Sequence, residues 1–517
     1  MDHAGECSVV IVGSGAAGLA LACELAASGV ACTVVERAAA GPPPSPAVLL
    51  QSRTLEELGL RGHARALIEQ ARPVARMRLG GRAAALDLQG SDSRFPGLYA
   101  LPQSRVEEVL AHRAAALGAV IRRGLRVEAL AQGADGVRLR LRRSADSGDA
   151  GQAGGAVELA AAYAVGCDTE RGSLRELAGI GREVREQLAA PVLAEVRLRQ
   201  PLSEDLLVRP GRGGVLVSVP AGDDWYRITL ALDSHPWSEP QPTAEEFTDA
   251  LRGLLGHDPG VVRVRALARP RTPQSLATHY RAGRVLLLGD AAHQHATLGG
   301  QGINLGLQDA VNLGWKLAAV VRGWCPPELL DSYEAERRPI AAKALRRSER
   351  AARHLAGASP ASALLRRTVL GGLPGPSPLR HAAAAEVAGP STRYPAGPLL
   401  DRASRLPLHA GQRLPELPVR MRQGPPMLAP DLLDDGRFLL LDFGHQGVAA
   451  TAAERGWGDR VRAVSAIGPL EGYVSISTLL VRPDGYLAWA DDSYDPTARI
   501  ERASRALTRW CGPAASA

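Results

Sequence analysis

Two glycine-rich turns, each between an apolar strand and an amphipathic helix, constrain this 517-residue chain more than any other feature. The first lies in "VVIVGSGAAGLALACELAASGVACTVVER", residues 9–37, whose pattern predicts a strand, a turn, a helix and a second strand. Gly13, Gly15 and Gly18 form G-x-G-x-x-G at this turn. Such glycines allow a tight turn, a close approach of the backbone to a pyrophosphate and close helix packing. The segment therefore predicts a βαβ unit that binds a dinucleotide.

The acidic residue at the end of the second strand limits which dinucleotides can bind. The carboxylate of Glu36 can accept hydrogen bonds from both hydroxyls of a ribose. The same negative charge would repel a 2′-phosphate, so the site suits FAD or NAD and not NADP. Composition and spacing alone leave the choice between FAD and NAD open.

The second turn favours a flavin. It lies in "GRVLLLGDAAHQHATLGGQGINLGLQDAVNLGWKLA", residues 283–318. Asp290 follows an apolar strand, where its carboxylate can hold a sugar-like polyol, and a helix is predicted to begin near Gly302. The N-terminus of that helix would stabilise the negative charge that gathers at the N1–C2=O edge of a reduced flavin.

Strand and helix patterns divide the chain into units. The dinucleotide-binding domain is predicted to be discontinuous, over residues 1–75, 100–178 and 281–355. Short alternating runs predict an interposed, mostly antiparallel β-sheet domain over 76–99 and 179–280. A connecting segment, 356–398, then leads to a C-terminal α/β unit over 399–517. Within this unit "LLVRPDGYLAW" predicts a hairpin whose turn contains Pro483, Asp484 and Gly485.

Charge and cysteine usage argue against several classes of protein. The formal net charge is +7, but the arginines are scattered, so we expect an affinity for anionic small molecules and no nucleic-acid partner. The 6 cysteines occur singly, which predicts neither a metal site nor a disulfide framework. No apolar run approaches the ~18 residues of a membrane span, and the N-terminal run fits a strand better than a signal peptide. We therefore expect a cytoplasmic protein with no membrane partner.

Five motifs in a fixed order resemble those of a known family. Besides the two glycine segments these are "LPQSRVEEVL", "YAVGCDTERGSLREL" and "LLDSYEAERRPIA". The chain resembles the single-component (group A) FAD-dependent aromatic hydroxylases of the para-hydroxybenzoate hydroxylase superfamily, and among them the bacterial enzymes that oxidise aromatic polyketides. The resemblance implies an α/β fold with a discontinuous Rossmann-like FAD-binding domain. It also implies an interposed substrate-binding sheet domain and a thioredoxin-like C-terminal domain.

The resemblance also implies which residues hold the cofactor. The first turn would hold the ADP half of FAD, with Val127 near the adenine, and the second turn would hold the flavin half. The two turns would then grip opposite ends of one FAD. The implied cofactor residues are Gly13, Gly15, Ala16, Ala17, Gly18, Glu36, Arg37, Gln103, Val127, Asp168, Gly289, Asp290, Gly300, Gly302, Ile303 and Asn304.

Three departures from the family pattern bear on the chemistry. Thr169 follows Asp168 where the family usually has glycine. Pro46 stands where an arginine is common, and Leu49 stands where a small residue is common. The segment "HATLGG" lacks the proline that usually follows the histidines. We expect FAD binding to be retained, and flavin reduction or ordinary hydroxylation to be the steps affected.

The chemistry implied by the resemblance is aromatic hydroxylation. NADPH would visit transiently and reduce FAD, O2 would add at the flavin C4a carbon, and the resulting hydroperoxide would deliver oxygen to a polycyclic aromatic polyketide. Val215, Val217 and Val219 share one face of a predicted strand and fit a pocket lining and a plain core equally well. No catalytic residue is assigned, because His293 and His295 fit structural hydrogen bonding better than general base catalysis.

Two alternative functions use the same scaffold. One is a Baeyer–Villiger or ring-cleaving oxygenase. The other is a flavin-binding accessory protein without turnover, which Pro46 and Thr169 would suit. Whichever of these functions applies, the expected assembly is a monomer or a homodimer.

Overall fold

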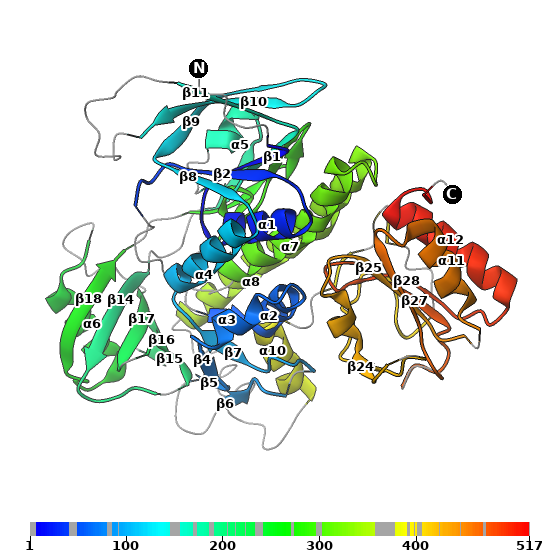
Figure 1. Ribbon diagram of the computed structural model, residues 1–517. Coiled ribbons are helices and arrows are strands. Elements are labelled where there is room, and N and C mark those ends of the chain that lie inside the picture. Colours follow the sequence, from blue (N-terminus) through cyan, green and yellow to red (C-terminus); the bar gives the residue numbers. More distant parts are fainter. Residues whose placement is uncertain are drawn as a thin grey trace.

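The computed structural model has a central layered unit, with a large β-sheet on one side and the C-terminal unit on the other (Figure 1). It describes residues 7–40, 49–79, 85–90, 92–144, 156–168, 173–185, 191–203, 205–211, 214–222, 224–232, 241–269, 273–295, 302–356, 378–389, 393–395, 397, 399–400, 406–422, 424–444, 446–468 and 472–515. The mixture of helices and strands confirms the predicted α/β class.

A six-stranded sheet with the order β20-β21-β12-β1-β2-β8 forms the centre. Its strands are β1 (Val9–Val12), β2 (Cys32–Glu36), β8 (Val120–Arg123), β12 (Tyr163–Gly166), β20 (Arg281–Ala282) and β21 (Val285–Leu287). All neighbouring strands are parallel except β20 and β21. Because parallel strands end at the same edge of a sheet, the turns after β1, β12 and β21 lie at one edge. Segments far apart in the sequence therefore meet where a dinucleotide is expected.

The alternating side chains of β1 serve two cores. Val9 and Ile11 pack with the helices α1 (Ala16–Ala27), α4 (Gln103–Ala116) and α7 (Gly302–Val321). Val10 and Val12 pack on the other face against the antiparallel sheet of β9 (Leu125–Gln132), β10 (Val137–Arg143) and β11 (Val157–Ala161). A strand buried on both faces reads as a continuous apolar run, which is what the sequence shows.

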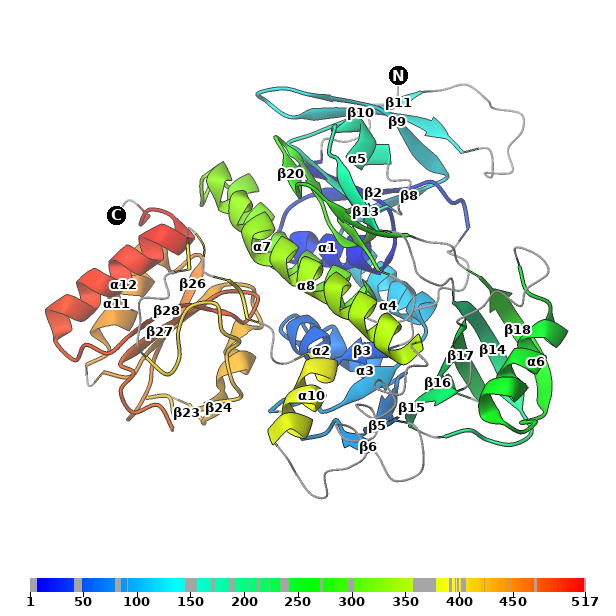
Figure 2. The same cartoon turned by 180° about the vertical axis from the view of Figure 1, so that it is seen from behind.

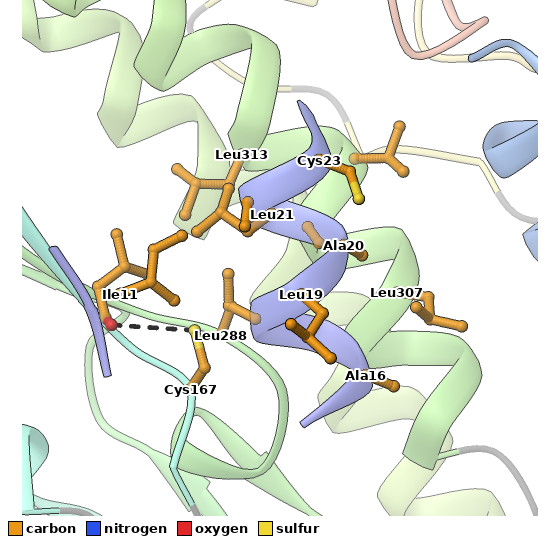
Figure 3. Close-up of a cluster of buried hydrophobic side chains, with 14 of the residues drawn as sticks. Ile11, Ala16, Leu19, Ala20, Leu21, Cys23, Cys167, Leu288, Leu307 and Leu313 are labelled. Carbon is orange, nitrogen blue, oxygen red and sulfur yellow. Dashed lines mark hydrogen bonds between the residues drawn. The ribbon is translucent and has the colours of Figure 1, made fainter. Parts of the chain in front are cut away.

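The α1 and α7 helices pack closely because small residues line their contact. Figure 3 shows Leu19 and Leu21 of α1 gathered with Ile11, Leu288 and Leu313 in this core. A Cβ at Gly314 of α7 would come within 2.5 Å of the Cβ of Glu24 on α1. The glycine thus allows the two helices to approach more closely than a side chain would permit.

A seven-stranded sheet with the order β18-β14-β17-β16-β15-β5-β6 lies beside the central unit (Figure 1). Its strands are β5 (Arg76–Leu79), β6 (Ala85–Asp87), β14 (Val192–Leu198), β15 (Leu206–Gly211), β16 (Gly214–Pro220), β17 (Trp225–Leu232) and β18 (Val261–Ala268). All pairings are antiparallel except β15 with β5. The α6 helix (Ala244–Leu255) packs on one face, and a capping box of Thr243 and Glu246 fixes its start.

Shorter elements join these units. They are β3 (Leu49–Gln51), α2 (Ser52–Gly59), α3 (Ala64–Ile68), β4 (Arg72–Val74), β7 (Leu98–Ala100), α5 (Ser173–Leu177), β13 (Arg182–Arg185), β19 (Gln274–Ala277), β22 (His293–Gln294), α8 (Asp331–Ala356) and α10 (Pro378–Ala388). β3, β7 and β4 form one small sheet, and β13, β19 and β22 form another. The α8 helix crosses the face of the central unit that is turned toward the viewer in Figure 2.

The C-terminal unit has a four-stranded sheet with the order β26-β25-β27-β28. Its elements are β25 (Phe438–Asp442), α11 (Val448–Trp457), β26 (Val461–Ser465), β27 (Thr478–Val481), β28 (Leu487–Asp491) and α12 (Pro496–Cys511), preceded by the short pair β23 (Pro418–Val419) and β24 (Met427–Leu428). β25 and β26 are parallel, and the other neighbours are antiparallel. The elements of this unit therefore follow one another in the order βαβ-ββα. The predicted hairpin is present, with Gly485 at φ +74° in its turn.

No helix in the described ranges combines the length and the apolar character needed to cross a membrane.

Candidate FAD site

The glycine turn after β1 forms a cradle in which side chains do not fit. Gly13 has φ +110°, and a Cβ there would lie 2.8 Å from the amide nitrogen of Asp168. A Cβ at Gly18 would lie 2.2 Å from the carbonyl oxygen of Gly13. A Cβ at Gly15 would instead meet nothing closer than Glu107 Oε1, at 3.8 Å. Gly13 and Gly18 are therefore required by the fold, whereas Gly15 keeps one side of the turn open.

Glu36, the last residue of β2, is hydrogen-bonded to this turn. Its Oε2 accepts hydrogen bonds from the backbone amide and the hydroxyl of Ser14, at 2.9 and 3.0 Å. Its Oε1 accepts from the amide of Ala38 at 2.8 Å. Arg123, which pairs with Glu36 across β2 and β8, donates to the Ser14 hydroxyl at 3.2 Å. A cation and a carboxylate thus lie together at the mouth of the turn.

A second carboxylate lies at the start of α1. Glu107 of α4 is 4% exposed, and its Oε1 accepts from the amide of Ala16 at 3.2 Å and from the Gln103 side chain at 2.7 Å. Burial raises the pKa of Glu107 above its ordinary value, against the lowering effect of the Gln103 hydrogen bond. The buried Oε2 has no hydrogen-bond partner among the described residues. Gln103 is therefore tied to the N-terminus of the dinucleotide helix through Glu107.

Asp168 lies against the same turn, at the end of β12. Its Oδ2 accepts from the amide and the hydroxyl of Ser173, at 2.9 and 3.1 Å, while Oδ1 is buried without a hydrogen-bond partner in the described part of the chain. Burial raises the pKa of Asp168, and the two hydrogen bonds from Ser173 oppose that shift. A buried acceptor beside the glycine turn is a feature that a hydroxyl-bearing ligand would satisfy.

The second turn, after β21, is held by a buried carboxylate. Asp309 of α7 accepts from the amide of Gly289 at 3.3 Å and is paired with His293 Nε2 at 2.5 Å and with Arg337 Nε at 2.6 Å. Burial raises the pKa of Asp309, but His293 and Arg337 outweigh it and hold that pKa below its ordinary value. The buried imidazole of His293 is thereby held by a hydrogen bond to Asp309. Asp290, the next residue of the turn, is exposed.

His295 differs from His293 because neither of its ring nitrogens has a hydrogen-bond partner among the described residues. Burial lowers the pKa of His295 to about 3, so its imidazole is neutral. Its Cβ lies 3.8 Å from the position of a Cβ at Gly302, where α7 begins.

The two glycine-rich turns touch one another. A Cβ at Gly289 would lie 3.1 Å from the methyl of Ala17 on α1. A Cβ at Gly306 on α7 would also lie 3.1 Å from that methyl and 3.4 Å from the Cα of Gly289. The starts of α1 and α7 therefore meet at one small-residue contact, at the edge of the central sheet. An extended ligand could contact both.

The side chain of Asn304 is fully buried and fixes α7 to β3. It accepts from the amide of Gln51 and donates to the carbonyl of Leu49, both at 2.8 Å. Leu49, one of the departures from the family pattern, is thus tied to the first turn of α7. Ile303, beside Asn304, is partly buried.

The remaining predicted residues are distributed as follows. Val127 on β9 is 7% exposed and packs in the core behind the turn. On β16, Val219 and the half-buried Val217 belong to one apolar cluster with β6 and β7, and Val215 is buried on the same face. Gly300 lies outside the described residues, as do the departures Pro46 and Thr169 and the histidine-loop segment 296–301.

Sequence reasoning missed Ser14, Glu107, Arg123, Asp309 and Arg337 as parts of this site. Glu107 could have been found, since a residue four positions after Gln103 lies on the same helix face. The contacts of Arg123 with Ser14 and of Arg337 with Asp309 join distant segments, and no local sequence pattern predicts them.

Comparisons with known proteins agree with this geometry. Residues 6–348 match the model of the FAD binding domain family, and residues 408–514 match that of the aromatic-ring hydroxylase C-terminal family. The 12-dehydrotetracycline 5-monooxygenase/anhydrotetracycline 6-monooxygenase of Streptomyces rimosus is 38% identical over 98% of this chain and 99% of that protein. The dialkyldecalin synthase of Streptomyces rugosporus is 32% identical over 98% of this chain and 99% of that protein.

The solved structure of OxyS anhydrotetracycline hydroxylase from Streptomyces rimosus has a TM-score of 0.80, with 35% identity. The similarity covers 99% of this chain and 100% of that one. The family models and the relatives together span both glycine-rich turns and the C-terminal unit. The chain belongs to the family of FAD-dependent aromatic-ring hydroxylases.

Proposed function

We propose that this protein is an NADPH-driven, FAD-dependent monooxygenase that hydroxylates a polycyclic aromatic substrate of the polyketide type. The observation that carries the proposal is the contact of the two glycine-rich turns through Ala17, Gly289 and Gly306. A single dinucleotide can span both helix starts only because these turns are adjacent. The tetracycline-related names of the relatives support the substrate class.

The residues at the first turn suit the ADP half of FAD. The open side at Gly15 leaves room for a pyrophosphate beside the amides of the α1 N-terminus. In this proposal Glu36 exchanges its bond to Ser14 for the ribose hydroxyls. Arg123 then supplies a positive charge near the phosphates.

The residues at the second turn suit the flavin half. Exposed Asp290 would hold the ribityl chain together with Gln103, and Asp168 would accept from a hydroxyl through its unpartnered oxygen. Gly302, Ile303 and Asn304 at the start of α7 would present backbone amides to the ring edge. Bound FAD supplies the redox chemistry, and this chain's own residues bind it, orient it and exclude water.

The substrate would lie between the central unit and the large sheet. The β16 face that carries Val215, Val217 and Val219 points away from α6, toward β6 and β7. Val217 is the only one of these three valines that is not fully buried, so it is the proposed substrate contact.

A second candidate function is a flavin-binding synthase that forms carbon–carbon bonds without net oxidation. The relative named dialkyldecalin synthase favours it, since that protein spans the same length at 32% identity. It would also suit the chain's departures from the family pattern at Pro46, Thr169 and "HATLGG".

NADPH consumption separates the two candidates. Purified protein loaded with FAD would be mixed with NADPH, with and without anhydrotetracycline as a probe of the substrate class. Monooxygenase function predicts that the polycyclic phenol accelerates NADPH oxidation and yields an oxygenated product. Bound FAD that NADPH does not reduce under any of these conditions would favour the synthase.

A further inference from the structure

The hairpin turn between β27 and β28 of the C-terminal unit is inserted into the central unit. Arg482 begins the turn, is fully buried, and donates from both terminal nitrogens to the carboxylate of Glu336 on α8, at 2.7 and 3.0 Å. Lys316 on α7 donates to the same carboxylate at 2.8 Å. Figures 1 and 2 show the C-terminal unit, in orange and red, beside the helices of the central unit.

The acidic residue of the turn contacts α7 directly. Asp484 Oδ2 accepts from the indole nitrogen of Trp315 at 3.1 Å and from the side-chain Nδ2 of Asn312 at 3.3 Å. Arg482 also pairs with Asp484. We name Arg482, Asp484, Glu336, Lys316, Asn312 and Trp315 the hairpin cluster.

The turn also holds α2. Arg53 donates to the carbonyl of Asp484 at 3.1 Å, and its guanidinium carbon lies 4.4 Å from the ring centre of Tyr486. Arg61 donates to the carbonyl of Pro483 at 3.2 Å. One turn of the C-terminal unit therefore fixes α2, α7 and α8 together.

The charges of the hairpin cluster balance, because two cations face two anions. Burial raises the pKa of Glu336, but Arg482 and Lys316 outweigh it and hold that pKa at about 2. Burial lowers the pKa of Lys316 to about 8. A buried ionic network of this kind adds little net stability. Its hydrogen bonds and ion pairs nevertheless fix the relative positions of the helices and the hairpin that carry them. The network is thus suited to setting geometry.

The hairpin cluster is connected to the flavin end of the proposed site. Glu336 is followed on α8 by Arg337, which donates a hydrogen bond to Asp309. Asp309 also accepts a hydrogen bond from the backbone amide of Gly289. Asn312 lies one helical turn after Asp309 on α7. The same two helices thus carry the hairpin cluster and the carboxylate that holds the second glycine turn.

We propose that Arg482 is a positioning residue of the FAD site, through which the C-terminal unit sets the position of α7 and of the Gly289 turn. The inference rests on the proposed placement of the flavin at the start of α7. It assigns to the C-terminal unit a role in cofactor geometry, although that unit has no C-x-x-C redox pair.

The test compares flavin binding with stability in matched variants of the full chain. Arg482→Met keeps an unbranched apolar stem and removes the charge and the hydrogen-bond donors, Arg482→Lys restores the charge, and Trp315→Phe removes one hydrogen bond to Asp484. Asp442→Asn is the control, because Asp442 is buried inside the C-terminal unit and caps α11 through the amides of Ala449 and Ala450. The readouts are the FAD dissociation constant of the apoprotein, the visible circular dichroism of bound FAD and the thermal midpoint.

Arg482→Met is expected to raise the FAD dissociation constant by about 3–30-fold and to change the visible circular dichroism. Arg482→Lys should recover part of the affinity, and Trp315→Phe should shift both flavin readouts in the same direction by less. Asp442→Asn should lower the thermal midpoint and leave both flavin readouts at wild-type values. The inference is overturned if Trp315→Phe, and any Arg482 variant that folds, keep wild-type flavin readouts. A wild-type chain that binds no FAD would instead contradict the proposed function, and the inference would fall with it.

Discussion

The methyl of Ala17 on α1 lies 3.1 Å from the position that a Cβ would take at Gly289. These residues belong to the two glycine-rich turns, which are separated by most of the FAD binding domain in sequence and adjoin in space. Gly289 has φ +60° and also donates its amide to Asp309, so its position is set from two sides. The proposed cofactor site depends on this contact.

The contact predicts a coupled effect of two substitutions. Gly306→Ala would place a methyl 3.1 Å from that of Ala17, so one helix must shift by a few tenths of an ångström. We expect this strain to outweigh the ~1 kcal/mol that alanine gains over glycine in a helix, with a net loss of about 1 kcal/mol in stability. Ala17→Gly in the same chain removes the opposing methyl and should recover part of that loss. Denaturant unfolding of the two single variants and the double variant measures the coupling. If the change in unfolding free energy of the double variant equals the sum of those of the two single variants, the two turns do not touch.

Two glycines of the first turn should respond differently to alanine. Gly18→Ala would place a Cβ 2.2 Å from a backbone oxygen and should cost ~3 kcal/mol or more in folding stability. Gly15→Ala meets nothing within 3.8 Å and should leave apoprotein stability nearly unchanged. It should nevertheless weaken FAD binding by roughly 10–100-fold, because the methyl occupies the side from which a pyrophosphate approaches. Equal FAD affinity of Gly15→Ala and wild type would show that the pyrophosphate does not bind on this side of the turn.

Arg123 should contribute to the affinity for FAD through its charge. Arg123→Ala is expected to weaken FAD and ADP binding by roughly 10–100-fold, as expected for the loss of a charge-assisted contact. Riboflavin binding should be unaffected, since it lacks phosphates. Arg138→Ala is the matched control, because Arg138 is exposed on β10 and alternates with the buried core residues Val137 and Leu139. A similar loss in both variants would indicate a general field effect.

The buried carboxyl of Glu57 predicts a pH dependence of stability. Burial raises its pKa from 4.5 to about 7, although Arg53 lies 2.9 Å away. Between these two values the folded state holds a proton that the unfolded state has lost. The stabilisation is therefore complete below pH ~4.5 and is lost as the pH rises through ~7, a change of about 3 kcal/mol. Glu57→Gln should flatten this part of the curve of unfolding free energy against pH. A wild-type curve with the same slope as the variant would show that Glu57 ionises normally.

Local pattern was enough to predict the elements but not the contacts among them. The strand, turn and helix around Gly13 follow from residues adjacent in sequence, and the hairpin at Gly485 follows from its turn residues. The parallel pairing of β15 with β5 and the Arg123 bond to Ser14 join segments that share no local signal. Alternation placed Val215, Val217 and Val219 on one face, yet it could not say that β6 and β7 lie opposite. The two-residue period of a strand shows which side chains share a face, whereas only the tertiary fold shows which elements pack against that face.

Oxygen-18 labelling tests the central claim most directly. FAD-loaded protein, NADPH and anhydrotetracycline would be incubated under oxygen-18 gas, and the product analysed by mass spectrometry and by its ring connectivity. Monooxygenase function predicts that one labelled oxygen atom enters the product as a hydroxyl on an intact ring system. A label found in a lactone or an opened ring would indicate Baeyer–Villiger or ring-cleaving chemistry. A product of this substrate that contains no oxygen-18 would contradict monooxygenase function.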